Sequence, residues 1–212
     1  MNNPEIMQKF IAVGAIVSDS HFVYTSGRHG SVYVNKDALY VHSEIISVLC
    51  QRMSQAYDAD SVDVVVAPVL GGVVLSQWVA HALSQRRRSG ETLAVFVEKS
   101  SESTDKRFHF TRGYDKYIAG KNILVVEDIL ATGGSVRQVV ELVRQHGGNI
   151  IGVSVLCNRG NVQPHDIGNV PINTLIEIDL QTYAAEVCPL CESGVPVNVE
   201  LGKGRAFLAR RG

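Results

Sequence analysis

ILVVEDILATGGS, residues 123–135, decides the fold of this chain. Its first five residues are mostly apolar and β-branched, which is typical of a parallel strand buried on both faces. Two acids, Glu127 and Asp128, stand where that strand should end. A Thr-Gly-Gly-Ser run follows, and valines then recur at helical spacing up to a Gly-Gly pair. The stretch therefore predicts a strand, a glycine loop and a helix in succession.

The predicted loop has the chemistry of a phosphate site. Glycines let backbone N–H groups point inward, Thr132 and Ser135 add hydroxyls, and a helix start contributes partial positive charge. Carboxylates just before the loop would accept hydrogen bonds from sugar hydroxyls. A phosphorylated ribose fits better than a nucleotide polyphosphate, because neither GxxxxGK[ST] nor GxGxxG after a strand is present. The alternative is an ordinary strand-to-helix turn with a capping hydroxyl.

VVEDILATGGS, residues 125–135, resembles the ribosyl-phosphate signature of the type I phosphoribosyltransferases. The resemblance implies an α/β fold, with a central parallel sheet of about five strands flanked by helices, and a small N-terminal hood. It also implies that Glu127 and Asp128 hold the ribose 2′- and 3′-hydroxyls, with Asp128 counted as catalytic. The 5′-phosphate of 5-phosphoribosyl 1-diphosphate would then be bound by Ala131, Thr132, Gly133, Gly134 and Ser135.

A second apolar strand and glycine loop occur earlier, at Val62 to Gly72. By the same resemblance, Leu70, Gly71 and Gly72 bind the leaving diphosphate through backbone N–H groups. Mg²⁺ should enter bound to that diphosphate. Orotate-specific members usually carry a lysine here, whereas this chain has Leu70 and Gly71. Either backbone groups and magnesium suffice, or a basic residue arrives from elsewhere.

Two features resemble the orotate-specific branch of the family. FVYTSGRHGSVYVN, residues 22–35, is similar to its amino-terminal hairpin, in which Arg28 would help to close over the base. The flanking segments 21–24 and 31–35 are expected to pair with each other. Arg159 follows the fourth predicted strand and matches the arginine that pairs with the orotate carboxylate. The alternatives are an ordinary surface hairpin and a solvated loop arginine.

SSESTDKRFHFTRGYDKY, residues 100–117, predicts a closing loop. Displacing diphosphate from the ribose C1 builds oxocarbenium character, so water must be excluded from that carbon. Lys99 and His109 are expected to be catalytic there, and the full set of candidate cations is Lys99, Lys106, Arg107, His109 and Arg112. The orotate-specific branch normally begins this loop with Arg-Lys, and this chain has Glu98 in place of that arginine.

Net charge and the N-terminal sequence limit which other classes of function we expect for this chain. The 212 residues carry a formal net charge of −1, so no basic excess indicates a nucleic-acid or membrane surface. The N-terminus lacks the pattern of a signal peptide, and we expect a cytoplasmic protein. The predicted organisation is a hood at 1–40, a phosphoribosyltransferase core at 41–184 and a tail at 185–212 that contains a CxxC motif.

The four cysteines do not form the pattern of a secreted disulfide scaffold, and we expect them to be reduced. Cys188-Pro-Leu-Cys191 alone is weak support for a metal or redox site. Structural zinc needs four ligands, which Cys157 and His165 could complete, but the spacing does not demand it. A plain structural role is favoured for both cysteines, and no metal ligands are assigned.

The resemblance implies transfer of phosphoribosyl from 5-phosphoribosyl 1-diphosphate to a nucleobase, with orotate as the expected acceptor. The products would be orotidine 5′-monophosphate and diphosphate. The alternatives are transfer to a different base and a non-catalytic regulator that binds phosphoribosyl diphosphate. A homodimer is implied by the resemblance alone.

Overall fold

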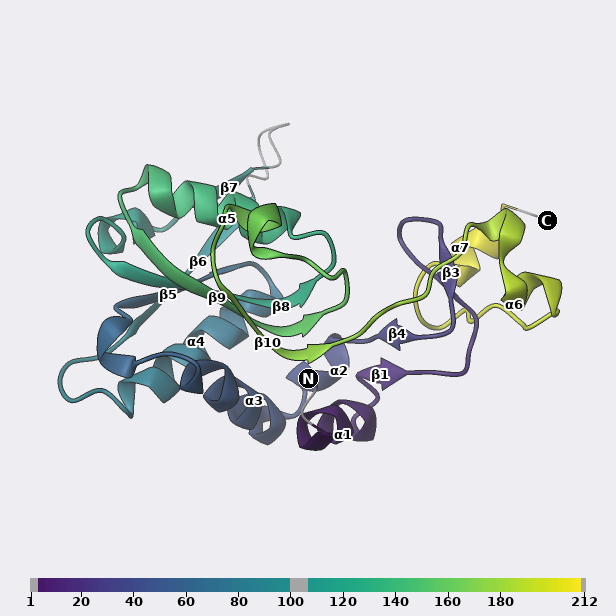
Figure 1. Cartoon of the computed structure of the whole chain (residues 1–212), viewed down its shortest axis with the longest axis horizontal. Helices are drawn as coiled ribbons and strands as arrows, with labels where there is room; N and C mark the ends of the chain where they lie inside the picture. Colours follow the sequence, from purple (N-terminus) through teal and green to yellow (C-terminus); the bar gives the residue numbers. More distant parts are fainter. Residues whose placement is uncertain (1–3, 100–106, 211–212) are drawn as a thin grey trace. The chain divides into compact units, whose positions relative to one another are not determined.

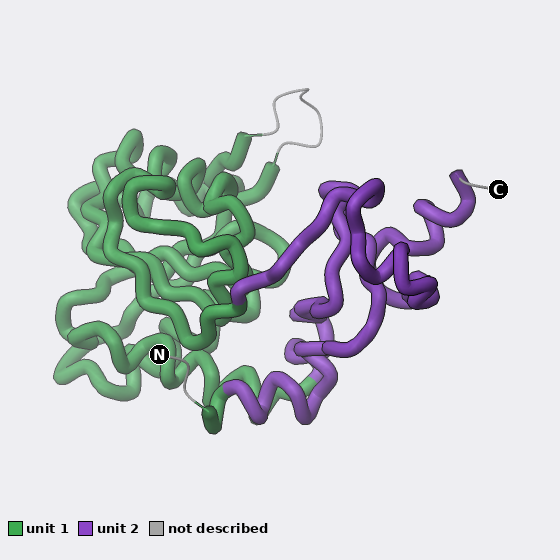
Figure 2. The backbone as a smooth tube through the Cα atoms, turned by 45° about the vertical axis from the view of Figure 1, so that its right-hand side comes forward, with its two compact units in different colours: residues 1–6, 42–178 green, residues 7–41, 179–212 purple. Residues whose placement is uncertain are grey.

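The computed structural model describes residues 4–99 and 107–210, and the chain divides into two compact units. Unit 1 comprises residues 1–6 and 42–178, and unit 2 comprises residues 7–41 and 179–212 (Figure 2). Most of the segment assigned to a hood and all of the described CxxC tail belong to unit 2. Unit 1 contains both predicted glycine loops.

Unit 1 is built on a six-stranded sheet with the strand order β10-β9-β8-β5-β6-β7 in the described residues (Figure 1). Five strands are parallel, and β7 is an antiparallel edge strand. The predicted α/β fold with a central parallel sheet is therefore confirmed. The strands are β5 (Val64–Pro68), β6 (Leu93–Lys99), β7 (Phe108–Phe110), β8 (Asn122–Leu130), β9 (Asn149–Asn158) and β10 (Ile172–Glu177).

Helices cover both faces of this sheet. Helix α5 (Gly134–Gln145) lies on one face, and α3 (Ser43–Gln55) and α4 (Gly71–Ser84) lie on the other (Figure 1). The central strands therefore have no solvent-facing side, which is why 123–126 can be apolar throughout. All four of those side chains are fully buried. Burying one valine contributes about 1.5–3 kcal/mol, so this strand is a large part of the core. The described part of unit 1 also contains three short 3-10 helices: η1 (Ala59–Ser61), η2 (Tyr114–Tyr117) and η3 (Pro164–Ile167).

The predicted closing loop at 100–117 is only partly a loop. Phe108–Phe110 forms β7, which pairs with the end of β6 so that His109 lies opposite Glu98. Phe108 is buried in the core, since only 5% of it is exposed. A three-residue strand is too short to give a recognisable sequence period, so the two aromatic residues were missed. The expected lid residue Lys106 lies outside the described residues.

Unit 2 joins the N-terminal and C-terminal parts of the chain. The predicted pairing of 21–24 with 31–35 is wrong. Instead β2 (Phe22–Val23) pairs with β3 (His29–Gly30), and β4 (Tyr33–Val34) pairs with β1 (Ile16–Val17). The tighter hairpin is closed by Gly27, whose positive φ of 79° suits glycine. The other elements are α1 (Pro4–Ala12), which begins in unit 1, α2 (Asp37–Tyr40), η4 (Ala185–Val187), α6 (Pro189–Glu192) and α7 (Gly204–Leu208).

Among the described residues, no helix combines the length and apolar character needed to cross a bilayer.

Glu98, which replaces the expected arginine, is tied to the segment after β7. The Thr111 hydroxyl donates to Glu98 Oε2 at 2.8 Å, and Arg112 Nη2 lies 3.4 Å from Oε1. The Thr111 hydrogen bond, followed by the Arg112 guanidinium, holds the pKa of Glu98 below its usual value. Arg112 also lies over the Phe96 ring, at 5.7 Å from its centroid. The predicted lid cation Arg112 is thus engaged in holding this segment.

Thr111→Val should raise the pKa of Glu98 toward its ordinary value of 4.5 by removing the donor that lowers it most. A depressed folded-state pKa stabilises the protein above the unfolded-state pKa, and this stabilisation is lost as the pH falls through the folded-state pKa. The stability difference between wild type and Thr111→Val should therefore be larger at pH 7 than at pH 3. Urea unfolding at both pH values checks this, with Thr25→Val, at an exposed threonine of unit 2, as control. A difference independent of pH would contradict the assigned hydrogen bond.

Candidate active site

Most of the predicted site residues of unit 1, with Lys99 and His109 as exceptions, come together at one edge of the sheet. Strands β5, β6, β8 and β9 are parallel, so their carboxyl ends share that edge. Ligands of open α/β sheets bind outside the carboxyl ends of the strands. Both glycine loops, the two acids and Arg159 follow or end these strands.

The loop after β8 forms a small pocket. It is lined by Glu127, Ile129 and residues 130–136, and its volume is about 90 Å³. Ligand sites for whole drug-sized molecules are roughly 300–1,000 Å³, so this pocket fits a phosphate group better than an entire nucleotide. Gly133 adopts a left-handed conformation at φ 74°, and the Arg137 N–H donates to its carbonyl at 2.8 Å. The loop therefore turns directly into α5.

The groups of this pocket that would attract an anion are backbone N–H groups and side-chain hydroxyls. The first N–H groups of a helix have no intrahelical acceptor, and α5 begins at Gly134. The Thr132 hydroxyl lies 3.5 Å from the Gly134 N–H, and the Ser135 side chain is exposed at the pocket. These groups and the positive end of the helix dipole suit an anion without any lysine.

The two acids at the end of β8 occupy different positions. Glu127 lines the phosphate pocket, on the same face of the strand as Ile129. Asp128 points to the opposite face and is 4% exposed, and its backbone N–H donates to Glu127 Oε1 at 3.0 Å. The structure therefore brings Glu127 directly to the loop, whereas Asp128 is not one of the residues that line this pocket.

Hydrogen bonds and close packing connect the segment after β9 to residues 130–131 of the loop after β8. The backbone N–H groups of Arg159 and Gly160 donate to the Leu130 carbonyl, at 2.9 and 3.1 Å. The Asn158 side chain bonds the backbone of Val162 in both directions, at 3.0 Å each. A Cβ on Gly160 would lie 1.7 Å from the Ala131 carbonyl oxygen, so only glycine fits. The Arg159 backbone is thus held beside the loop.

The pKa of the Cys157 thiol is shifted by burial and by the charged residues near this segment. Burial raises the pKa of the Cys157 thiol to about 12, Arg159 lowers it and Asp128 raises it. Arg159 and Asp128 therefore both act on one thiol in β9. Asp128 lies in β8 and Arg159 directly follows the neighbouring parallel strand β9, so the predicted ribose carboxylate and the predicted base-binding cation stand at the same edge.

The second glycine loop begins another helix at this edge. Val69 and Leu70 follow β5, their peptide bond is cis, and α4 begins at Gly71. A Cβ on Gly72 would lie 2.7 Å from the Ala67 Cβ, so glycine allows close packing of helix on strand. The Leu70 side chain is 86% exposed. Because β5 and β8 are neighbours, two helix N-termini lie at the same edge of the sheet.

Lys99 and His109 are not brought to the phosphate pocket. The Lys99 ammonium lies over the Phe108 ring, 4.9 Å from its centroid. His109 is exposed and lines another pocket of about 310 Å³ with residues of α5, among them Gln138 and Glu141. Their catalytic roles stay predictions.

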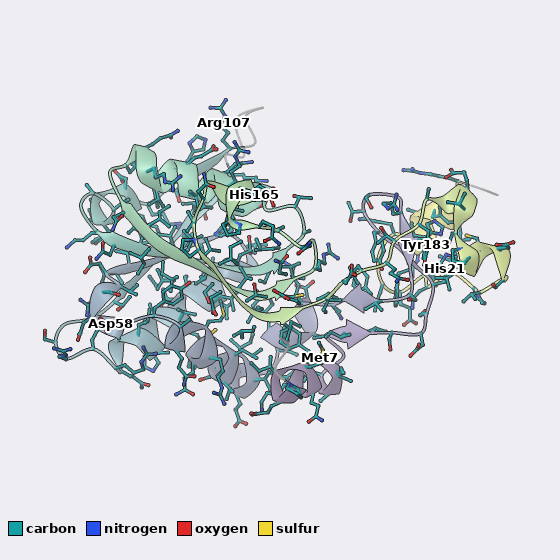
Figure 3. The ribbon with its side chains drawn as sticks, viewed as in Figure 1. Met7, His21, Asp58, Arg107, His165 and Tyr183 are labelled. Carbon is teal, nitrogen blue, oxygen red and sulfur yellow. The ribbon has the colours of Figure 1, made fainter. Side chains whose placement is uncertain are left out.

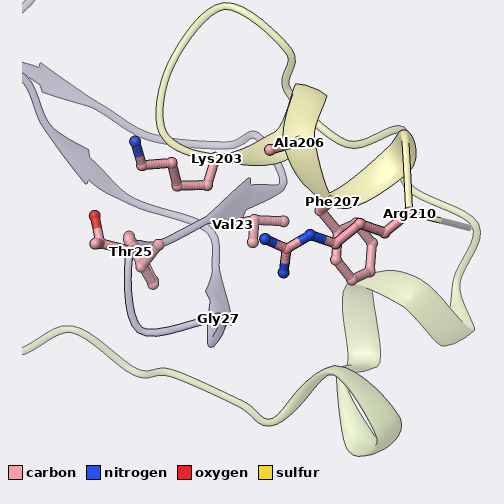
Figure 4. Close-up of a pocket in the computed structure, with 8 residues that line it drawn as sticks. Val23, Thr25, Gly27, Lys203, Ala206, Phe207 and Arg210 are labelled. Carbon is pink, nitrogen blue, oxygen red and sulfur yellow. The ribbon is translucent and has the colours of Figure 1, made fainter.

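Arg28 belongs to unit 2, where its Nε donates to Thr182 Oγ1 at 2.8 Å. A pocket of about 340 Å³ lies beside the same hairpin, lined by residues that include Thr25, Gly27, Lys203 and Arg210 (Figure 4). Sequence analysis missed the tail residues of this pocket. The Gly-Lys-Gly-Arg run at 202–205 was the available signal.

Gly133→Ala should destabilise unit 1 by about 1–3 kcal/mol, because it puts a side chain at positive φ in a packed site. Its Cβ would lie 2.8 Å from Ile167 and 2.9 Å from Val162. Gly134→Ala is the matched control, since its Cβ meets only Thr132 Oγ1 at 3.6 Å. Urea unfolding of both variants checks this. Equal stability of the two variants would show that the loop is not held as described.

Comparisons with known proteins agree with this arrangement. Residues 37–184 match the phosphoribosyl transferase domain family. An orotate phosphoribosyltransferase of Pelotomaculum thermopropionicum is 36% identical over 196 residues, which cover 92% of this chain and 95% of that protein.

Two solved structures share the fold. The orotate phosphoribosyltransferase from Aeropyrum pernix aligns with a TM-score of 0.66 at 21% identity, over 81% of this chain and 93% of that one. An adenine phosphoribosyltransferase from Thermoanaerobacter pseudethanolicus aligns with a TM-score of 0.56 at 17% identity, over 70% and 90% of the respective chains. Fold similarity therefore does not select the base. The sequence matches nevertheless establish that this chain belongs to the type I phosphoribosyltransferase family, with orotate phosphoribosyltransferases among its relatives.

Proposed function

We propose that the chain transfers the phosphoribosyl group of 5-phosphoribosyl 1-diphosphate to a ring nitrogen of orotate, giving orotidine 5′-monophosphate and diphosphate. The observation that carries the reaction class is the small N–H-lined pocket at the start of α5, with Glu127 at its rim. The choice of orotate is supported by the 36% identical relative of nearly the same length. The retained Arg159 supports it as well.

In this proposal, residues 131–135 hold the 5′-phosphate. Glu127 and Asp128 accept hydrogen bonds from the ribose hydroxyls, which are donors that suit carboxylates. The diphosphate then reaches toward Leu70, Gly71 and Gly72, where the backbone N–H groups at the start of α4 face it. Two helix N-termini at one sheet edge support this placement of a substrate with phosphates at both ends.

We propose that Mg²⁺ arrives with the diphosphate. Magnesium is usually bound by one or two carboxylates together with substrate phosphates. Glu127 is half-buried at the pocket and offers oxygen ligands of the right kind. The ion, when bound, neutralises charge that develops on the leaving diphosphate. The chain's own contribution is to hold both ends of the ribosyl donor and to keep water from C1.

The acceptor needs orientation more than activation. Orotate already carries its negative charge on the carboxylate, and the proton that its ring N–H loses as the bond to C1 forms is taken up by the leaving diphosphate, so no strong general base is needed from the chain. Most of the acceleration would come from placing the ring nitrogen against C1 and from fixed dipoles that face the developing charge. Lys99 at the end of β6 and His109 in β7 are the candidates to act on the departing diphosphate. We also propose a homodimer, for which the family resemblance is the support.

Arg159 is the proposed contact for the orotate carboxylate. Its backbone is fixed by the bond to Leu130, and its side chain, half-buried after β9, has a planar guanidinium suited to two parallel hydrogen bonds. Arg28 stays a proposed contact of the base, for which the family resemblance is the support.

The reaction is tested by diphosphate release from the full chain supplied with phosphoribosyl diphosphate and Mg²⁺. Orotate, uracil, hypoxanthine, guanine, adenine, xanthine and nicotinate are offered separately. We expect release with orotate alone. Release with another base would correct the specificity but leave the phosphate site intact. Tight binding of phosphoribosyl diphosphate without release would identify a binding protein instead.

Arg159→Ala should raise the KM for orotate about 10- to 150-fold, which corresponds to losing a charge-assisted contact of about 1.5–3 kcal/mol. The KM for phosphoribosyl diphosphate should change little. Steady-state kinetics with each substrate varied in turn separates the two. The matched control is Arg88→Ala. Arg88 precedes β6, its side chain is 89% exposed, and it forms an ion pair with Asp60. Equal effects of Arg159→Ala on both substrates would remove Arg159 from the base site.

A further inference from the structure

Four metal-binding side chains meet inside unit 2, away from the residues assigned to the reaction. His21 and His29 come from the N-terminal hairpin, and Cys188 and Cys191 come from the CxxC of the tail. One potential ligand atom from each lies within 4.8 Å of all the others. The hairpin and the tail are far apart in sequence, so the fold itself assembles this set.

Three of the distances between these atoms match those of a tetrahedral site. His21 Nε2 lies 2.8 Å from His29 Nδ1 and 3.7 Å from the sulfur of each cysteine. Cys191 Sγ lies 3.4 Å from His29 Nδ1. Zinc bonds of about 2.3 Å to sulfur and about 2.0 Å to nitrogen place tetrahedral ligand atoms roughly 3.3–3.8 Å apart. Of these four distances only that of the nitrogen pair is shorter, and a small outward movement of one ring would accommodate an ion.

The surroundings hold the ligands in place. His21 is 1% exposed, His29 0% and Cys188 2%. The other ring nitrogen of His21, Nδ1, lies 2.8 Å from the Val195 carbonyl. A backbone carbonyl on the second nitrogen is the usual partner of a metal-ligating histidine, because it leaves the first nitrogen unprotonated toward the metal.

The backbone fixes the same two histidines. His29 and Tyr183 exchange both backbone hydrogen bonds, at 2.8 and 2.9 Å, and the Asn198 N–H donates to the His21 carbonyl at 2.8 Å. Figure 3 labels His21 and Tyr183 in unit 2. The Phe207 ring of α7 packs edge-on against His29 at 4.7 Å. The C-terminal segment of unit 2 thus positions both histidines of the N-terminal hairpin.

We propose that His21, His29, Cys188 and Cys191 bind one Zn²⁺ ion as a structural site. Two thiolates and two imidazoles in tetrahedral arrangement are a ligand set typical of zinc. All four positions are supplied by the protein, so no open position remains for a reacting water or substrate. The site is independent of the proposed reaction.

This site explains what holds unit 2 together. The unit has about 70 residues in two separate segments, a size at which a hydrophobic core alone is often insufficient. A metal that bridges residues 167 positions apart closes a long loop and adds its binding free energy to folding. The ion would fix the hairpin that carries Arg28 and the α7 residues of the pocket in Figure 4.

The sequence alternative that completed the CxxC with Cys157 and His165 is wrong. Cys157 is buried in β9 of unit 1 and pairs with Ile129 and Ile176 across the sheet. His165 lies 3.4 Å from Asp166 in η3 of the same unit, and Figure 3 labels it there. No metal ligand was assigned from sequence, because the two histidines lie on a distant hairpin.

The first test is the metal content of the full chain, purified without an affinity tag in the presence of a reductant. We expect one zinc per chain, and cobalt substitution should give the intense visible bands of tetrahedral thiolate coordination. Cys188→Ser and His29→Asn should lose the metal. Cys50→Ala and His165→Asn are controls that should keep it. Wild-type protein with reduced thiols that neither contains zinc nor takes up zinc or cobalt would overturn the proposal.

Thiol counting provides a second readout that does not depend on how the variants fold. Burial raises the pKa of Cys50 and of Cys157 to about 12, so these thiols should stay unreactive in the native protein. Cys188 and Cys191 should be protected by the metal and become reactive when a chelator removes it. The expected change is from no fast-reacting thiol to two. Two fast-reacting thiols before chelation, or a disulfide in their place, would contradict a zinc site.

Discussion

Strand β8 is buried on both faces, and the rest of unit 1 depends on this constraint. Its apolar half can be covered only if helices lie on both sides of the sheet, so α5 must return across one face while α3 and α4 cover the other. The two acids of the strand, Glu127 and Asp128, follow this apolar run and stand near its carboxyl end. The glycine loop follows at the same edge and begins α5 there.

The proposed recognition at this edge relies on backbone groups more than on charged side chains. The start of α5 offers N–H groups to a phosphate, and the start of α4 repeats this arrangement on the neighbouring strand. This is compatible with a chain whose formal net charge is only −1 and whose proposed diphosphate loop, residues 70–72, has no lysine. Charge enters locally, through Glu127, Asp128 and Arg159. Glycine is required where these loops pack closely, as at Gly72 and Gly160.

Much of unit 1 could be predicted from sequence, because strand, glycine loop and helix are local patterns. Residues 123–146 carry the β-branched run, the turn glycines and the helical spacing within one continuous segment. Arg159 could be placed at the carboxyl edge of the sheet because it directly follows a predicted parallel strand. Strand β7 was missed because Phe108–Phe110 is stabilised by pairing with β6 and by burial, not by a period of its own.

Unit 2 was harder to predict because long-range contacts determine it. The pairing of β2 with β3 leaves β4 to pair with β1, a choice that alternation alone does not reveal. The His21, His29, Cys188 and Cys191 cluster unites two segments separated by the whole of unit 1. A CxxC shows half of such a site in sequence, and only the fold supplies the other half.

The central claim is that the start of α5 binds the phosphate of a phosphorylated ribose. A crystal structure of the full chain with ribose 5-phosphate tests it most directly. The account predicts the phosphate within hydrogen-bond distance of backbone N–H groups of residues 132–135, with ribose hydroxyls toward the acids that end β8. A phosphate bound instead at Leu70 to Gly72, or a loop that stays empty at saturating ligand, would contradict it.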